Sequence, residues 1–571
     1  MNLYIVETSA PFFLFSTGKI NWSKIPFNDI ETERNFSQSK FNKIIPAYTN
    51  YLHQIKKIGY NAMSIDDLSH LVNRSFYPDK LQKKITSYEK NYRLFFKIAQ
   101  EIDLGIYTKT DLMFYNCAIK DFIKKDRITI FKLMADYLEQ LFVKYPLVKG
   151  VIIRIGEKDG VDVRGDFKSE LTIKSPKDLR AFIISVLPLF HRYKKTLIIR
   201  TWTVGAYEIG DLIWNKETYQ KVFKDIEDEN LVVSMKYGES DFFRYLDMSD
   251  AIFDTKQKKI IEFQAKREYE GFGEFPVFTG WEYKRYLSKL SRLNHIIGIW
   301  SWPQEGRWSS MSPRLTYVTH SSLWNELNTY SILKIAKDCW SVKKCIKTFY
   351  KNTFPDTSSD KKEDAFVTLL RLSDKVINKG FYIEELAKKQ LYFRRTRVPP
   401  LLFPWWQNGS INDLNYSFIK RYVVDKKKAI RHGQEALRYI KQMKKLSKGL
   451  NLKQDFNFYY DTFYILYLIR KAIFAEQNLE KKIKATTKIY SKKYHQGFFF
   501  DLNITKNKLR LLLFNYLFKI VIREKSPYRL FDKIILNTKI TTFLGKLVAK
   551  PMIKFSPLDE GIAMPITILF Q

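Results

Sequence analysis

Along its first 330 residues the chain alternates short apolar runs with segments in which apolar residues recur every three or four positions. One such stripe consists of Tyr48, Leu52, Ile55 and Ile58, and it predicts an amphipathic helix just before an apolar run. Eight units of this kind in about 330 residues predict an α/β fold, the TIM or (β/α)8 barrel. The predicted strands are Phe12–Thr17, Tyr60–Asp66, Leu104–Thr110, Val148–Gly156, Thr196–Val204, Leu231–Gly238, Ile260–Lys266 and Ile296–Trp302.

After residue 330 the strand pattern fades and long helical patterns replace it. We therefore predict two domains, the barrel at residues 1–330 and a mainly α-helical, basic domain at residues 331–571. The most apolar run of the second domain, Leu511–Ile522, is interrupted by Asn515 and Lys519 and is shorter than the roughly 18 residues of a membrane span. We expect it to form a buried helix, in preference to a helix lying on a membrane surface.

The chain is strongly basic, with 97 Lys and Arg against 60 Asp and Glu and a formal charge of +37. Such a charge attracts nucleic acid, anionic membranes or acidic polysaccharides. The basic residues are spread along the chain, which argues against a specific nucleic-acid groove. A coding sequence rich in A and T also gives a high lysine content, without any binding function. The three cysteines, Cys117, Cys339 and Cys345, lack metal-ligand spacing, and the N-terminus lacks the basic region of a secretion signal. We predict a cytoplasmic protein without metal or cofactor, and leave open peripheral contact with an anionic inner membrane face and a homodimer.

Several predicted strands end in acidic or aromatic residues, and the strand ends of a barrel meet at one mouth. Cleavage of a glycosidic bond needs a protonated acid, a carboxylate that activates water, and flat aromatic surfaces for sugar rings. The mouth therefore favours a glycosidase, although a single acidic residue at a strand end is more often a loop cap. The candidates, from the fourth to the eighth strand, are Glu157, Asp159, Arg200, Trp202, Glu208, Lys236, Glu239, Asp241, Glu262, Gln264, Glu268, Glu270, Trp300, Trp302 and Trp308.

Two of these candidates are basic residues in or near apolar strands. Arg200 lies inside the run LIIRTW, and Lys236 lies near the end of VVSMK. Buried positive charges require an anionic partner. A substrate carboxylate would serve, and so would Asp241 or Glu268.

Three segments, Tyr51–Asp66, Val233–Phe242 and Glu262–Tyr269, resemble segments of glycoside hydrolase family 67, the inverting α-glucuronidases that remove glucuronic acid from xylan fragments. Tyr51–Asp66, YLHQIKKIGYNAMSID, is similar to the family's helix and second strand. Val233–Phe242, VSMKYGESDF, is similar to the family's VQVKNGPxDF, and Glu262–Tyr269, EFQAKREY, to its ExQITQEY. The resemblance covers about residues 10–350. It does not extend to the N-terminal β-sandwich domain of the family.

The resemblance implies roles for individual residues. Asp241 and Glu268 match the two carboxylates that activate the water, and Arg200 and Lys236 match the basic pair that holds the uronic acid carboxylate. Glu157 is expected to be the general acid, with Asp159 as its competitor. The substrate side of the site is expected to include three tryptophans, Trp202, Trp302 and Trp308.

The leading interpretation is an inverting glycoside hydrolase that cleaves a terminal α-linked uronic acid from an acidic oligosaccharide or polysaccharide. A different class of function is a non-catalytic or repurposed barrel that binds acidic glycan in surface-polysaccharide metabolism, such as that of a capsule or O-antigen. The lesser alternative is nucleic-acid binding through the +37 charge.

Overall fold

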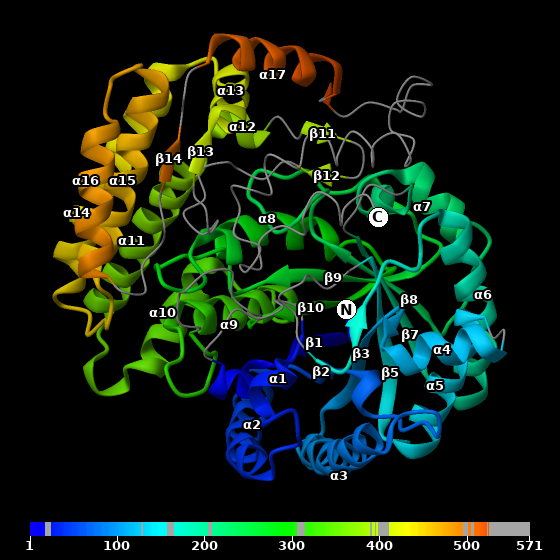
Figure 1. Cartoon of the computed structure of the whole chain (residues 1–571). Helices are drawn as coiled ribbons and strands as arrows, with labels where there is room; N and C mark the ends of the chain where they lie inside the picture. Colours follow the sequence, from blue (N-terminus) through cyan, green and yellow to red (C-terminus); the bar gives the residue numbers. More distant parts are fainter. Residues whose placement is uncertain are drawn as a thin grey trace.

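The computed structural model describes residues 1–16, 24–126, 129–156, 165–203, 208–304, 314–388, 391–393, 396–397, 410–494, 501–503, 507–521 and 523–524. Its centre is a closed barrel of parallel strands in the order β1-β10-β9-β8-β7-β5-β3-β2, so the predicted (β/α)8 barrel is confirmed (Figure 1). The barrel strands are β1 (Leu3–Glu7), β2 (Ala62–Asp66), β3 (Gly105–Asp111), β5 (Val148–Gly156), β7 (Thr196–Thr203), β8 (Leu231–Lys236), β9 (Lys258–Gln264) and β10 (Ile296–Trp302).

The first barrel strand is not the predicted one. β1 is the run LYIVE, and its Ile5 pairs with Ala62 of β2 and Trp300 of β10. The predicted strand Phe12–Thr17 falls largely in a 3-10 helix, Ala10–Phe15, and Thr17 lies outside the described residues. Pro11 explains the difference, because it lacks an N–H for a central sheet ladder but fits the first turn of a helix.

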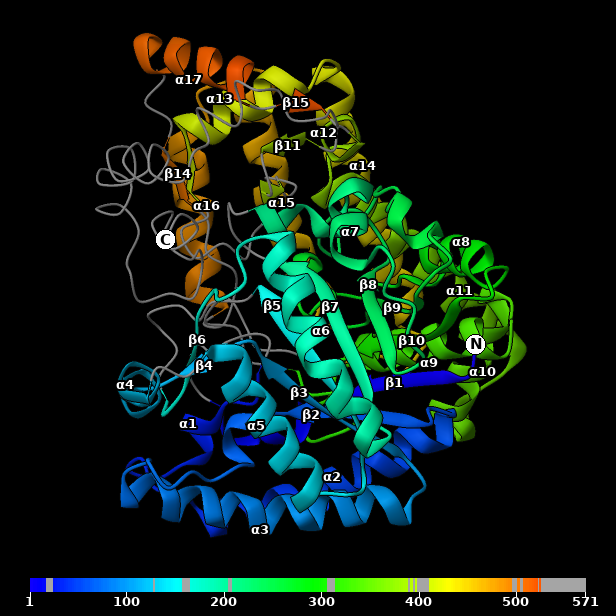
Figure 2. The same cartoon turned by 90° about the vertical axis from the view of Figure 1, so that its right-hand side faces the viewer.

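The other seven strands follow the prediction to within a few residues, and helices cover the outside of the barrel (Figure 2). The buried stripe of α2 includes Tyr48, Leu52, Ile55 and Ile58, as the periodicity predicted. The helices that follow the strands are α1 (Phe27–Ile30), α2 (Gln38–Ile58), α3 (Asp79–Glu101), α4 (Cys117–Asp126), α5 (Ile130–Lys144), α6 (Pro176–Tyr193), α7 (Lys216–Phe223), α8 (Gly280–Leu290) and α9 (Leu323–Lys337).

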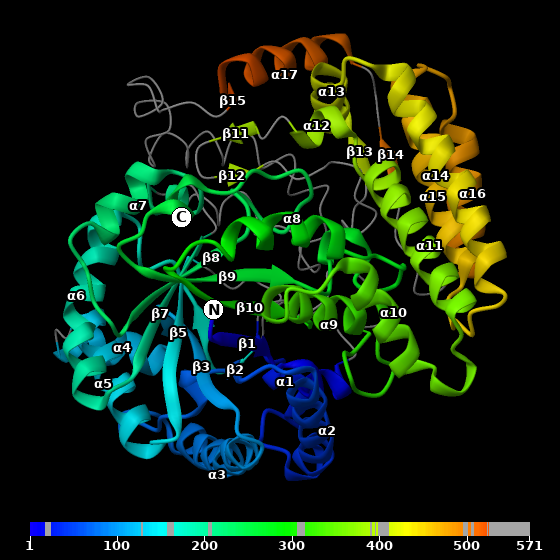
Figure 3. The ribbon, with the colours of Figure 1, turned by 180° about the vertical axis from the view of Figure 1, so that it is seen from behind.

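The described residues after α9 are mainly helical, as predicted, and form a layer beside and above the barrel in the view from behind (Figure 3). Short strands join this part, with β11 (Leu391–Phe393) between β12 (Thr396–Arg397) and β15 (Arg523–Glu524), and β13 (Ser410–Asn412) beside β14 (Asp501–Asn503). The helices are α10 (Val342–Thr353), α11 (Asp360–Val376), α12 (Glu384–Lys388), α13 (Asp413–Tyr422), α14 (Lys426–Ser447), α15 (Phe456–Phe474), α16 (Glu480–Lys493) and α17 (Lys508–Val521).

The run Leu511–Ile522 was expected to form a buried helix, and for one face of α17 this expectation is wrong. Leu511 and Phe514 pack against the core, but Leu512, Leu513 and Tyr516 are exposed. The run is apolar on more sides than one, and a helix packed on a single neighbour can bury only one stripe. Among the described residues no helix is both long and apolar enough to cross a membrane.

Candidate active site

Charged and aromatic side chains line the C-terminal ends of the barrel strands, the end at which barrel enzymes place their chemistry. Every one of the charged residues in this ring is buried, and Trp202 is half-buried. A ring of this kind needs internal charge pairing, because an isolated buried charge is costly. By strand, the ring consists of Glu7 (β1), Asp66 (β2), Lys109 and Asp111 (β3), Arg154 (β5), Arg200 and Trp202 (β7), Lys236 (β8), Glu262 and Gln264 (β9), and Trp300 and Trp302 (β10).

Asp241, which follows β8, is fixed by three donors. The Lys236 ammonium donates to its Oδ1 at 2.5 Å, and the Phe242 backbone N–H donates to the same oxygen at 2.8 Å. The Tyr269 hydroxyl donates to Oδ2 at 2.5 Å. Lys236 also lies over the Trp202 ring, 3.5 Å from its centre. The predicted base is therefore held at a defined place beside an aromatic face.

Glu268 begins η5 (Glu268–Glu270), a 3-10 helix between left-handed Arg267 (φ 57°) and Gly271 (φ 99°). The Gln264 side-chain amide donates to Glu268 Oε1, and its carbonyl oxygen accepts from the Glu268 N–H, both at 3.0 Å. Since the next residue, Tyr269, bonds to Asp241, the structure brings the segments that carry the two predicted bases into direct contact.

Arg200 has a partner that the sequence did not indicate. Its Nε donates to both carboxylate oxygens of Glu262, at 3.1 and 3.0 Å, and both side chains are buried. The Ser234 hydroxyl donates to the same carboxylate at 2.8 Å. The two predicted substrate-binding cations thus each carry an internal counter-ion, Arg200 from Glu262 and Lys236 from Asp241.

The tryptophans lie between these groups. The rings of Trp300 and Trp302 are 4.2 Å apart, and the Arg200 guanidinium lies over Trp302 at 4.7 Å. Trp300 donates its indole N–H to the Ser64 hydroxyl at 3.0 Å. The buried Trp302 indole N–H has no hydrogen-bond partner within the part of the chain that the structure describes.

Sequence reasoning missed the half of the ring that comes from β1 to β5. Lys109 Nζ lies 3.3 Å from both Glu7 and Asp66, and 5.0 Å from the centre of the Trp302 ring. Burial raises the pKa of Glu7, although Lys109 opposes the shift. Arg154 could have been found, because it lies inside the apolar run VIIRIG as Arg200 lies inside LIIRTW.

Three predicted site residues lie outside the described residues: Glu157, Asp159 and Trp308. Their roles stay predictions. Glu208, after β7, is exposed and pairs with Lys221 at 3.4 Å, as a surface residue does.

Glu270, another strand-end candidate, belongs to a buried ion cluster. Arg244 donates two hydrogen bonds to its carboxylate, at 3.0 and 3.2 Å, and Arg267 donates two, at 3.1 and 2.5 Å. The Tyr382 hydroxyl donates a fifth at 2.8 Å. Although burial raises the pKa of Glu270, the two arginines bring it to about 2. Arg244 also donates to Asp374 of α11. Glu270 therefore ties the loops after β8 and β9 to the helical layer.

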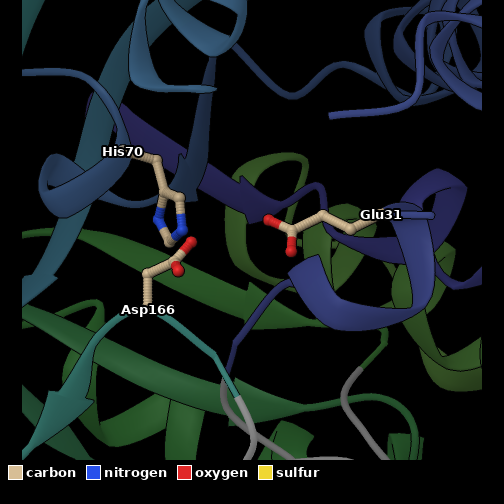
Figure 4. A group of neighbouring side chains, drawn as sticks. All are labelled: Glu31, His70 and Asp166. Carbon is tan, nitrogen blue, oxygen red and sulfur yellow. The ribbon is translucent and has the colours of Figure 1, made fainter. Parts of the chain in front are cut away.

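Glu31, His70 and Asp166 point toward one another on the loops after β1, β2 and β5, with ligand atoms within 4.8 Å (Figure 4). Lys84 lies between the two carboxylates, 3.0 Å from Glu31 and in contact with Asp166. His70 Nδ1 is 2.8 Å from Asp67. The Lys84 ammonium supplies the positive charge that the two carboxylates require, so a divalent metal ion would have to displace it.

The chain matches no protein family model, and no curated protein matches its sequence. Several solved structures are similar to it in fold at low identity. A family 89 glycoside hydrolase from Clostridium perfringens shares 10% identity over 92% of this chain and 68% of its own, with a TM-score of 0.42. An O-GlcNAc hydrolase from Thermobaculum terrenum shares 9% over 85% and 89%, with a TM-score of 0.37. A β-mannanase from the blue mussel Mytilus edulis shares 11% over 59% and 93%, with a TM-score of 0.30.

Proposed function

We propose that this protein is a glycoside hydrolase that removes a terminal α-linked uronic acid from an acidic oligosaccharide or polysaccharide. The observation that carries the proposal is the link between Asp241 and the Glu268 segment through Tyr269, at the mouth of a closed barrel. The resemblance of Val233–Phe242 and Glu262–Tyr269 to family 67 supports the choice of sugar.

The proposed reaction is a single displacement with inversion. Asp241 and Glu268 take the proton from a water molecule as its oxygen attacks the anomeric carbon, and Glu157 gives a proton to the leaving glycosidic oxygen. Such a site needs about 6.5–9.5 Å between acid and base, so that the water fits between base and sugar. The three donors on Asp241 hold its carboxylate in one orientation beside the position proposed for the water.

Recognition of the uronic acid would use Lys236 and Arg200. Lys236 is already paired with Asp241, and Arg200 with Glu262. A substrate carboxylate would therefore share each cation with a carboxylate of the protein. Because Asp241 and the substrate would then bind the same ammonium, substrate binding would place the sugar directly beside the base. Trp202 and Trp302 offer ring faces next to these cations.

The test is release of free uronic acid from α-linked glucuronosyl and galacturonosyl oligosaccharides. We expect release by the wild type and a loss of about 10²-fold or more in Asp241→Asn and in Glu268→Gln, because each variant keeps the shape but loses the base. Glu101→Gln, at an exposed site on α3, is the matched control and should retain full activity. NMR should show that the uronic acid is released first as the β-anomer, the opposite of its α-configuration in the substrate. Equal activity in all four proteins would contradict the assignment.

A second function is favoured by one observation: both oxygens of Asp241 already accept hydrogen bonds within the protein. A barrel in which this carboxylate serves only as a counter-ion to Lys236 would bind acidic glycan without cleaving it. Calorimetric binding of the same oligosaccharides with no release by the wild type would select this function, and Lys236→Met should then abolish binding.

A further inference from the structure

Helix α17 exposes one apolar face. Leu509, Leu512, Leu513 and Tyr516 are 78%, 67%, 56% and 64% exposed. Their spacing of three, four and seven residues places them on a single side of the helix. This contiguous stripe differs from the scattered single apolar residues that every protein surface carries, and it calls for a partner.

The rest of α17 explains how it is held. Leu511 and Phe514 pack against the core, and the helix lies on α13 at the outer edge of the helical layer (Figures 1 and 3). All three views place α17 on the opposite side of the molecule from α3 (Figure 2). A flat surface can therefore approach α17 without meeting the described part of the barrel.

The charge around the exposed face is positive. α17 contains Lys508, Arg510 and Lys519 and no acidic residue. The helix α13, on which α17 lies, has Lys420 and Arg421 in its last turn, and the whole chain carries +37. An apolar stripe flanked by Lys and Arg is the composition of a helix that lies at the surface of an anionic bilayer.

We propose that α17 docks this protein onto a membrane surface rich in anionic lipid, with the helix in the plane of the headgroups. Leu509, Leu512 and Leu513 enter the boundary between headgroups and acyl chains, and the flanking lysines contact lipid phosphates. At 14 residues the helix is about 21 Å long, so it lies on the bilayer rather than crossing it. Two copies of a +37 chain repel each other, which favours the membrane over self-association as the occupant.

The experiment is co-sedimentation of the full chain with vesicles of phosphatidylcholine alone and with a phosphatidylglycerol fraction. We expect binding only to the anionic vesicles. In Leu512→Asn with Leu513→Asn the affinity should fall at least about tenfold, because the apolar contribution to docking is lost. The matched control is Val143→Asn with Ile184→Asn, two exposed apolar residues on the barrel helices α5 and α6, and should bind as the wild type does.

A second pair of variants isolates the charge. Lys508→Gln with Lys519→Gln should weaken binding to anionic vesicles, whereas Lys83→Gln with Lys90→Gln, exposed on α3, should not. Equal weakening by both pairs would mean diffuse attraction by the net charge and would overturn the proposal. A dimer in light scattering that Leu512→Asn with Leu513→Asn converts to monomer would also overturn it, in favour of a second copy. Unchanged thermal unfolding shows that each variant is folded.

Discussion

At the scale of single residues, Tyr269 is the connection on which the proposed site depends. Its hydroxyl donates to Asp241 Oδ2, while its neighbour Glu268 is fixed by Gln264. A hydrogen bond to a charged group contributes about 1.5–3 kcal/mol, so Tyr269→Phe should lower kcat for uronic acid release by about ten- to hundredfold. The control is Tyr88→Phe, which removes a similar bond to Glu31, a carboxylate that has no role in the proposed reaction. Equal losses in the two variants would mean that Tyr269 acts only through stability.

Single residues also show what the sequence could predict about the site. Arg200 and Lys236 were recognised because a charge inside an apolar run must face a polar interior, and both do lie at the mouth. Asp241, one of the two carboxylates expected as a counter-ion, does pair with Lys236. The partner of Arg200 could not be assigned, because pairing depends on which strands face each other at the same height. Glu262 reaches Arg200 across β8, and no spacing in the sequence reports that distance.

At the scale of elements, η5 combines a proposed base with an ionic anchor. Glu270 compensates Arg244 and Arg267, both buried, so Glu270→Gln leaves two arginines short of their counter-ion. Removing one partner of a buried pair costs about 3–5 kcal/mol of unfolding free energy. Chemical denaturation at neutral pH should show a loss of that order, whereas exposed Glu101→Gln should show none.

The pH dependence of that loss has a defined sign. The pKa of Glu270 is about 2 in the folded protein against a usual 4.5, so as the pH falls the unfolded chain binds the proton first. The stabilisation by Glu270 is complete above about pH 4.5 and disappears toward pH 2. The difference in unfolding free energy between wild type and Glu270→Gln should therefore shrink over that window. A difference independent of pH would contradict the ionic role.

The elements predicted best are the buried barrel strands, which alternate along the chain with helices. Seven of the eight barrel strands were predicted, since each is a buried apolar run, and an α-helix follows each of them except β8, which leads to β9 through the 3-10 helix Asp250–Phe253. β1 was missed because LYIVE is short and ends in Glu7, while APFFLF is the more apolar run. α17 was predicted as a helix but not as an exposed one, because periodicity identifies an apolar face without identifying what covers it.

At the scale of the whole molecule, the barrel and the helical layer meet at Arg244. This residue follows Asp241 by three positions, binds Glu270 of η5, and donates to Asp374 of α11. The helical layer thus contacts the loop after β8 that carries the proposed base. Asp374→Asn leaves the buried Arg244–Glu270 pair in place and weakens only the connection between the two parts.

Because the Asp374 side chain is about a quarter exposed (27%), its pair with Arg244 is partly screened, and we expect a loss of about 1–2 kcal/mol. We also expect kcat for uronic acid release to fall, with KM little changed, since the loop that holds Asp241 becomes less rigid while Arg200 and Trp302 are untouched. The control is Asp364→Asn on the same helix, which pairs with Lys343 and Lys347 at the surface and should alter neither quantity. A fall in stability without a change in kcat would show that the helical layer supports the barrel without positioning its site, and the two parts would then be functionally separate.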